Sequence, residues 1–214
     1  MNKPHDFLKG LYAITPEDNL LPRLSTLVGL ALEGGVKLVQ YRNKDAPMAL
    51  KRSQAAELLR ICHARDARLI VNDDVWLAIE IGADGVHLGR GDGDPVMARQ
   101  ALGPKRVLGV SCYDDVERAV RAAEAGADYV AVGSMFASAT KPQAVRASLD
   151  MIVEVKRRVK VPVAAIGGIK LDNAGPLLDA GADMVAVLSD LFDAMDIKGR
   201  AAAFQNLFDK HLTR

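Results

Sequence analysis

Three polar side chains occupy alternate positions at the end of an apolar run near the start of the chain. Gln40, Arg42 and Lys44 stand two residues apart, so an extended backbone would present all three on one side. Two cations and an amide are costly to bury without partners, but they suit a polyanion such as a diphosphate. The alternative interpretation is a solvated loop, because long charged side chains are mostly exposed.

Carboxylates follow two further apolar runs. Asp73 ends one of these runs, Asp74 comes directly after it, and Asp92 follows the run that contains His87. Carboxylates at adjacent strand ends can share one hard cation, and Mg²⁺ takes one or two of them together with water and phosphate oxygens. Asp also commonly caps a helix. We interpret Asp74 as the better cap and Asp73 as the better metal ligand.

Small and hydroxyl-bearing residues follow the last apolar runs. The segment 134–142 contains Ser138, Thr140 and Lys141, which could hold a phosphate, although such a loop is more often polar surface. Gly168 follows the seventh run and Ser189 ends the eighth, where exposed backbone N–H groups can bind a phosphate. These residues predict a second anion site beside the first.

The remaining residues with chemical potential are weaker candidates. His87 has apolar neighbours and is interpreted as a hydrogen-bonded structural histidine rather than a base, while His5, His63 and His211 are interpreted as terminal or surface residues. Trp76 and the methionines are expected in the packing. We find no Ser-His-Asp arrangement and no carboxylate pair placed for glycoside chemistry.

A Gly-Ala-Asp phrase recurs along the chain and indicates the elements that position these residues. It begins at Gly82, Gly126 and Gly181, each time after a helical stretch and before a β-branched run, and residues 33–36 are a looser copy. Glycine just past a helix supplies a left-handed cap that lets the chain reverse into a strand. The intervals are 44 and 55 residues, so one supersecondary unit is reused without a strict solenoid period.

Eight apolar runs are predicted as strands, and several are almost continuously apolar, as parallel strands covered on both faces must be. Their ranges are 11–15, 36–42, 68–73, 85–89, 106–112, 129–134, 161–167 and 184–189. Amphipathic stretches such as 49–63 and 114–125 alternate with them. The pattern predicts a (β/α)₈ TIM barrel over residues 1–214 as a single domain. An open doubly wound sheet is the alternative, but no G-x-G-x-x-G follows the first run.

Composition excludes several classes of protein. The 214 residues are 50% hydrophobic and 26% charged, which is enough to bury a core without disulfides or a structural metal. The net charge of +1 and the 5% aromatic content argue against a nucleic-acid partner. Cys62 and Cys112 lack metal-ligand spacing, and no apolar leader or 18-residue apolar run occurs. We expect a soluble cytoplasmic protein with no membrane partner.

With these motifs the sequence resembles the thiamine-phosphate synthase family over nearly its whole length. The matching segments, in chain order, are 11–15, 40–45, 71–73, 82–89, 109–111, 126–133, 140–141, 165–169 and 185–189. The resemblance implies a transferase that joins 4-amino-2-methyl-5-hydroxymethylpyrimidine diphosphate to 4-methyl-5-(2-phosphooxyethyl)thiazole, as its carboxylated tautomer. The products would be thiamine phosphate and pyrophosphate. Both partners are small molecules, and the oligomeric state stays open between a monomer and a homo-oligomer.

The resemblance also implies a role for individual residues. The pyrimidine diphosphate would be bound by Gln40, Tyr41, Arg42, Asn43, Lys44, Asn72, Ser111 and Lys141. The thiazole phosphate would be bound by Ser138, Ala139, Thr140, Gly168, Leu188 and Ser189. Asp73 and Asp92 would hold Mg²⁺ as the cofactor. Arg42, Lys44, Ser111 and Lys141 are the residues expected to act in catalysis.

The chemistry we infer is a dissociative substitution. The aminopyrimidine stabilises a cation at its methylene carbon while Mg²⁺, Arg42, Lys44 and Lys141 stabilise the leaving pyrophosphate. The thiazole nitrogen then attacks that carbon, so no protein nucleophile is required and positioning carries the rate.

The chain departs from the family pattern in three places. Arg90-Gly91 replaces Gln-Glu before the metal carboxylate, Ser134 replaces a proline, and Ala137-Ser138 replaces Pro-Thr. Arg90 therefore adds a positive charge near the expected metal site. A thiazole tautomerase is the alternative enzyme, but its relatives use a histidine shortly after the residue that matches Ser111, and this chain has none there. A non-catalytic phosphate-binding barrel is the third interpretation.

Overall fold

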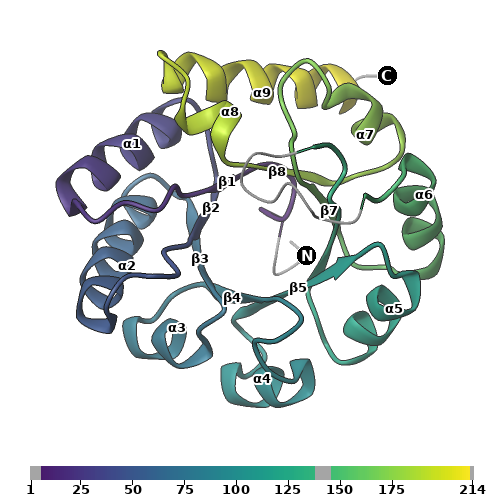
Figure 1. Ribbon diagram of the computed structural model, residues 1–214, viewed down its shortest axis with the longest axis horizontal. Helices are drawn as coiled ribbons and strands as arrows, with labels where there is room; N and C mark the ends of the chain where they lie inside the picture. The colour runs from purple at the N-terminus through teal and green to yellow at the C-terminus, as the bar shows by residue number, and fades with distance from the viewer. Residues whose placement is uncertain (1–5, 138–145, 213–214) are drawn as a thin grey trace.

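Eight parallel strands close into a barrel, with helices around the outside (Figure 1). This computed structural model describes residues 6–137 and 146–212. The strands follow one another around the barrel in chain order, and β8 pairs with β1 to complete it. The predicted (β/α)₈ fold is confirmed.

The strands are β1 (Gly10–Ile14), β2 (Leu38–Tyr41), β3 (Arg68–Asn72), β4 (Gly85–Leu88), β5 (Val107–Tyr113), β6 (Tyr129–Val132), β7 (Val163–Ile166) and β8 (Met184–Val187). The helices are α1 (Leu21–Glu33), α2 (Met48–His63), α3 (Val75–Ile81), α4 (Pro95–Leu102), α5 (Val116–Glu124), α6 (Leu149–Arg158), α7 (Gly175–Asp179), α8 (Ser189–Phe192) and α9 (Ile197–Leu212). Among the described residues, none of these helices has the length and apolarity that a membrane span requires.

Each Gly-Ala-Asp phrase ties a helix to the barrel by the same contacts. Its glycine takes a positive φ, of 73° at Gly82, 90° at Gly126 and 98° at Gly181, as a left-handed cap requires. Its carboxylate accepts a hydrogen bond from a backbone N–H of the preceding strand. The pairs are Asp84 with Leu69 at 2.8 Å, Asp128 with Leu108 at 2.8 Å, and Asp183 with Val163 at 2.7 Å. The repeated phrase is therefore a structural joint that spaces the strands.

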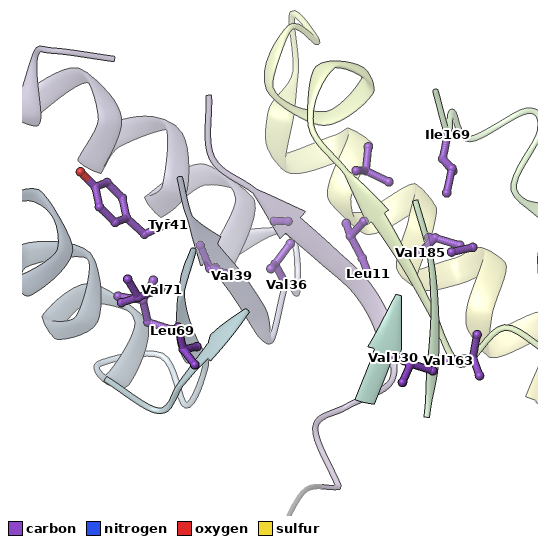
Figure 2. Packing of buried hydrophobic residues seen from close by; sticks show 14 of the residues in the cluster. Leu11, Val36, Val39, Tyr41, Leu69, Val71, Val130, Val163, Ile169 and Val185 are labelled. Atoms are coloured by element: carbon purple, nitrogen blue, oxygen red, sulfur yellow. The ribbon is translucent and has the colours of Figure 1, made fainter. Parts of the chain in front are cut away.

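Alternate residues of the strands face two separate apolar layers. The outward side chains pack against the helices, and Figure 2 shows Val39, Val71 and Val185 in this outer layer. The inward side chains fill the barrel, where Tyr12 and Tyr129 lie among small residues such as Ala131 and Ala164. The interior thus combines apolar packing with two phenol groups.

The end of β2 differs from the prediction. The run 36–42 was expected to remain extended through Arg42, but the strand ends at Tyr41. Thr15 explains the difference, because its hydroxyl accepts from Arg42 N at 2.9 Å and donates to Arg42 O at 3.3 Å. Arg42 and Lys44 consequently leave the strand and turn over the barrel rim.

Candidate active site at the carboxyl end of the barrel

The two cations that follow β2 are each paired with a carboxylate. The Arg42 guanidinium donates to Glu17 Oε1, and the Lys44 ammonium lies 3.0 Å from Asp73 Oδ2. The Arg42 side chain is 17% exposed and that of Lys44 is 46% exposed. A bound diphosphate would therefore compete with two protein carboxylates for these cations.

Asp73 and Asp92 meet at the ends of β3 and β4. Asp73 has a φ of 66°, and its N–H donates to His87 O at 2.8 Å. Asp92 Oδ2 accepts from Gly89 N at 2.8 Å. A Cβ at Gly89 would come within 2.6 Å of that oxygen, so glycine is what permits the approach. Asp74, in contrast, caps α3 by accepting from Leu77 N at 2.8 Å, as predicted.

The two carboxylates differ in proton affinity. Burial and the hydrogen bond with Asp92 raise the pKa of Asp73 above its ordinary value, although Lys44 opposes them. Burial acts in the same direction on Asp92, but hydrogen bonds with Asp73 and Gly89 outweigh it and lower the pKa of Asp92. A hard dication can replace the proton that such a pair shares. No group of three or more His, Cys, Asp or Glu placed for a metal occurs in residues 6–137 and 146–212.

A cavity of about 430 Å³ opens beside this pair, between the beginnings of α2 and α3. Lys44, Lys51, Asp73, Trp76 and Asp92 are among the residues that line it. Trp76 is 73% exposed, so the expectation that it packs in the core is wrong. It occupies the first turn of α3 and is one of the residues that line the cavity.

Tyr41 and Asn43 lie on the outer side of β2 and fix its turn into α2. The Tyr41 hydroxyl donates to Gln54 Oε1 at 2.9 Å, and Asn43 Nδ2 donates to the same oxygen at 3.1 Å and to Asp18 O at 3.1 Å. Gln54 Nε2 donates to Asp18 O at 2.6 Å. Both residues also line the cavity, so they shape the wall that Lys44 extends.

Some strand positions alternate with the residues that face outward to the helices. They include Gln40, Asn72 and Ser111. Gln40 is buried, and its Nε2 donates to the Tyr12 hydroxyl at 2.7 Å. Ser111 Oγ lies 2.8 Å from His87 Nε2. His87 is buried, with a hydrogen-bond partner at each ring nitrogen, so the interpretation of a hydrogen-bonded structural histidine is confirmed. Tyr12 and Tyr129 were missed, because the partners of an isolated tyrosine cannot be read from sequence.

Gly168, Leu188 and Ser189 stand on the opposite part of the same rim. Gly168 has a φ of 60°, and its carbonyl accepts from Asn173 Nδ2 at 3.1 Å. Leu188 precedes α8, and Ser189 is its exposed first residue. Ser138, Ala139, Thr140 and Lys141 lie outside the described residues.

Arg90 contacts the ring of Tyr113. Its guanidinium carbon lies 4.7 Å from the centre of the Tyr113 ring, and Arg118 lies 5.8 Å from the same ring. Arg90 N donates to the Tyr113 hydroxyl at 3.0 Å. The positive charge that departs from the family pattern is thus placed on an aromatic face, where cation–π attraction accommodates it.

Comparisons with known proteins identify the family and the fold. A family model described as thiamine monophosphate synthase matches residues 11–191. The chain is 52% identical over 206 residues to a thiamine-phosphate synthase of Aromatoleum aromaticum, covering 96% of this chain and 99% of the relative. It is 48% identical to that of Nitrosococcus oceani, covering 94% and 93%. A solved structure of thiamine phosphate pyrophosphorylase from Pyrococcus furiosus superposes with a TM-score of 0.88 at 34% identity, covering 98% and 100%.

Proposed function

Because the chain belongs to the thiamine monophosphate synthase family, we propose how its rim residues carry out the reaction of that family. The enzyme condenses the pyrimidine diphosphate with the thiazole phosphate and forms thiamine phosphate and pyrophosphate. The observation that carries the assignment of roles is the meeting of Lys44, Asp73 and Asp92 at one cavity. A cation and two carboxylates there suit a metal-bound diphosphate.

Asp73 and Asp92 are the residues we assign to Mg²⁺. When bound there, the ion would neutralise charge on the diphosphate and make pyrophosphate a better leaving group. Lys44 now contacts Asp73, and it would move to the diphosphate once the metal takes its place at the carboxylate. Arg42 would act on the same leaving group after releasing Glu17.

The other residues orient the two substrates. Gln40, Asn72 and Ser111 face the barrel mouth and would hold the pyrimidine with its diphosphate, while Tyr41 and Asn43 shape the wall beside them. Gly168, Leu188 and Ser189, together with Ser138–Thr140, would hold the thiazole phosphate at the other side of the rim. Lys141 would complete the diphosphate contacts. Since the thiazole nitrogen is itself the nucleophile, the protein supplies positioning and electrostatic stabilisation.

The metal assignment is tested by replacing one carboxylate at a time. Asp73→Asn and Asp92→Asn are each expected to raise the Mg²⁺ concentration needed for half-maximal activity at least tenfold, because each removes a charged ligand from a hard cation. Asp74→Asn is the matched control, since Asn can replace Asp as the cap of α3. The readout is thiamine phosphate formed from both substrates during a Mg²⁺ titration.

Two results would contradict the assignment. A wild-type Mg²⁺ requirement in Asp92→Asn would remove that residue from the metal site. Failure of the wild-type protein to form thiamine phosphate would favour a tautomerase or a non-catalytic phosphate-binding barrel.

We also infer a reducing, cytoplasmic location for the enzyme. Cys62 and Cys112 are both free and buried, and disulfides are rare in proteins of that compartment.

A further inference from the structure

A continuous chain of hydrogen bonds crosses the inside of the barrel between two of the proposed substrate residues. We call it the polar relay. Gln40 Nε2 donates to the Tyr12 hydroxyl at 2.7 Å, and Tyr12 lies 2.7 Å from the Tyr129 hydroxyl. Tyr129 lies 2.8 Å from His87 Nδ1, and His87 Nε2 lies 2.8 Å from Ser111 Oγ. The five side chains come from five different strands, so only the closed barrel assembles them.

The barrel is built to hold this relay. A Cβ at Gly109 would collide with the Tyr129 ring, so the glycine makes room for that side chain. The rings of Tyr12 and Tyr129 pack edge to face at 5.8 Å, and Tyr129 stacks on His87 at 5.6 Å. A buried polar group left without a partner is destabilising, because it has lost its hydrogen bonds to water. The barrel interior can therefore retain these groups only while the relay is complete.

The relay has one direction of donation. An amide nitrogen only donates, so Tyr12 accepts from Gln40 and must use its single proton elsewhere. Burial raises the pKa of both phenols far above the ordinary value, so each keeps that proton. The other hydrogen-bond partner of the Tyr12 hydroxyl is Tyr129, at 2.7 Å, so we assign the Tyr12 proton to that bond. Tyr129 then donates to His87 Nδ1, and because that nitrogen accepts, the ring hydrogen lies on Nε2, which donates to Ser111.

This direction determines what the two ends offer to a ligand. Gln40 has its amide nitrogen committed to Tyr12, so its carbonyl Oε1 is the group left to face the barrel mouth. Ser111 already accepts from His87, so its hydroxyl proton is available for donation. The ends therefore present an acceptor at Gln40 and a donor at Ser111. With the opposite direction Gln40 would present a donor and Ser111 an acceptor. An acceptor at Ser111 would repel an anion.

We propose that Tyr12, Tyr129 and His87 are positioning residues that set Gln40 as an acceptor for the exocyclic amino group of the pyrimidine and Ser111 as a donor to its diphosphate. The inference rests on the proposed function for Gln40 and Ser111. The fixed orientation of Gln40 would also select the ligand, because a pyrimidine without an amino donor would leave the Gln40 carbonyl unpaired. None of the three residues needs to touch the reacting atoms.

Nuclear magnetic resonance of the ligand-free enzyme tests the direction of the relay without any substrate. In protein labelled with ¹⁵N, His87 is expected as the neutral tautomer with hydrogen on Nε2, and its signals are assigned by their loss in His87→Gln. Tyr129→Phe removes the donor to Nδ1, so the Nδ1 resonance should shift and the fixed tautomer should be lost. A His87 signal with hydrogen on Nδ1 in the wild type, or one unchanged in Tyr129→Phe, would overturn the relay.

Kinetics test what the relay does. Tyr12→Phe and Tyr129→Phe should each raise KM for the pyrimidine diphosphate about tenfold, the effect of one lost hydrogen bond to a charged ligand, and leave KM for the thiazole phosphate unchanged. Val107→Ala is the packing control, because Val107 lies in the same interior layer and outside the relay. It should change neither KM. Circular dichroism checks that each variant folds. Tyr12→Phe and Tyr129→Phe each test the positioning role separately.

The outcomes separate this inference from the proposed function. If Gln40→Ala and Ser111→Ala raise KM for the pyrimidine diphosphate while both phenylalanine variants do not, the positioning role is overturned and the proposed function stands. If none of the four variants changes KM, the proposed function fails at Gln40 and Ser111, and the positioning role fails with it. In that case the magnetic resonance result still reports on the relay itself.

Discussion

The Arg42–Glu17 pair illustrates how a single residue can oppose substrate binding. The Arg42 guanidinium is proposed to bind diphosphate, yet it donates to the Glu17 carboxylate. Glu17 is 37% exposed, and ion pairs of such exposure contribute about 0.2–1 kcal/mol. Glu17→Gln should therefore raise the affinity for the pyrimidine diphosphate by about two- to fivefold, because the anion no longer competes with a carboxylate. Calorimetry with each substrate separately measures this.

A matched pair on the helices provides the control. Glu80 contacts Arg52 at 2.6 Å, and both are about half exposed, so Glu80→Gln loses a comparable ion pair away from the rim. It should leave both affinities unchanged. Arg42→Ala should act in the opposite direction to Glu17→Gln and weaken binding of the pyrimidine diphosphate alone. Equal effects of Glu17→Gln on both substrates would show that Arg42 does not discriminate between them.

The sequence predicts residues of this site unequally. Asp73 and Asp74 could be assigned different roles because a cap and a ligand have different local positions, and the structure confirms Asp74 as the cap. Glu17 and Arg42 are 25 residues apart, and Tyr12 and Tyr129 are 117 apart. Contacts over such distances depend on the closed barrel, and no short motif records them. Pairing partners were therefore the part of the site that the sequence could not supply.

At the scale of elements, the strands were predictable because burial on both faces leaves a nearly continuous apolar run. All eight predicted runs contain a strand or overlap one. Their ends were less predictable, since a side chain distant in sequence can terminate a strand, as Thr15 does at Arg42. The Gly-Ala-Asp phrase was predicted as a reused unit, but only the structure shows that its carboxylate bonds to the preceding strand.

The joint between α5 and β6 offers a test of that unit. Asp128 accepts from Leu108 N at 2.8 Å and from the Arg99 guanidinium. Both donors bind Asp128 Oδ2, so Asp128→Asn can keep the two contacts through its amide oxygen but removes the negative charge that pairs with Arg99. We expect a loss of about 1–3 kcal/mol in the free energy of unfolding, as for a charge-assisted hydrogen bond. Denaturant unfolding of the variant measures it.

Asp114→Asn serves as the comparison for this joint. Asp114 is exposed in the turn before α5, so its replacement should change stability by less than about 0.5 kcal/mol. Asp128→Asn should retain the wild-type KM values at low temperature, because Asp128 lies at the opposite end of the barrel from the site. An equal, small effect of both substitutions would mean that the phrase contributes nothing beyond its glycine.

At the scale of the whole molecule, the barrel brings residues from distant segments to one rim. The proposed substrate residues that the structure describes lie in the carboxyl-terminal parts of β2, β3 and β5 or directly after β2, β7 and β8, at the end of the barrel where this fold places its active sites. Closure of β8 onto β1 and packing of α9 against α1 and β1 tie the late segments to the early ones. We propose on this basis that the chain works as one domain, because no strand can be removed without opening the barrel.

The segment between β6 and α6 has both of its described ends on that rim. Phe136 N donates to Gly167 O at 2.9 Å, and Ala147 N donates to Ser134 O at 2.9 Å. Lys141 lies between these anchors in the sequence. We predict that it contacts the diphosphate, as the proposed function assigns it.

Lys141→Ala should consequently uncouple the two halves of the reaction. Without this cation the pyrophosphate leaves more slowly, and water has better access to the pyrimidine cation, which it converts to the hydroxymethylpyrimidine. We expect at least a tenfold lower rate, as for other lost transition-state charge contacts, and more than one pyrophosphate released for each thiamine phosphate formed. Lys160→Ala is the control, because Lys160 is an exposed lysine that precedes β7 at the other end of the barrel. Measuring both products in one assay gives the ratio, and a ratio of one at an unchanged rate would exclude Lys141 from the site.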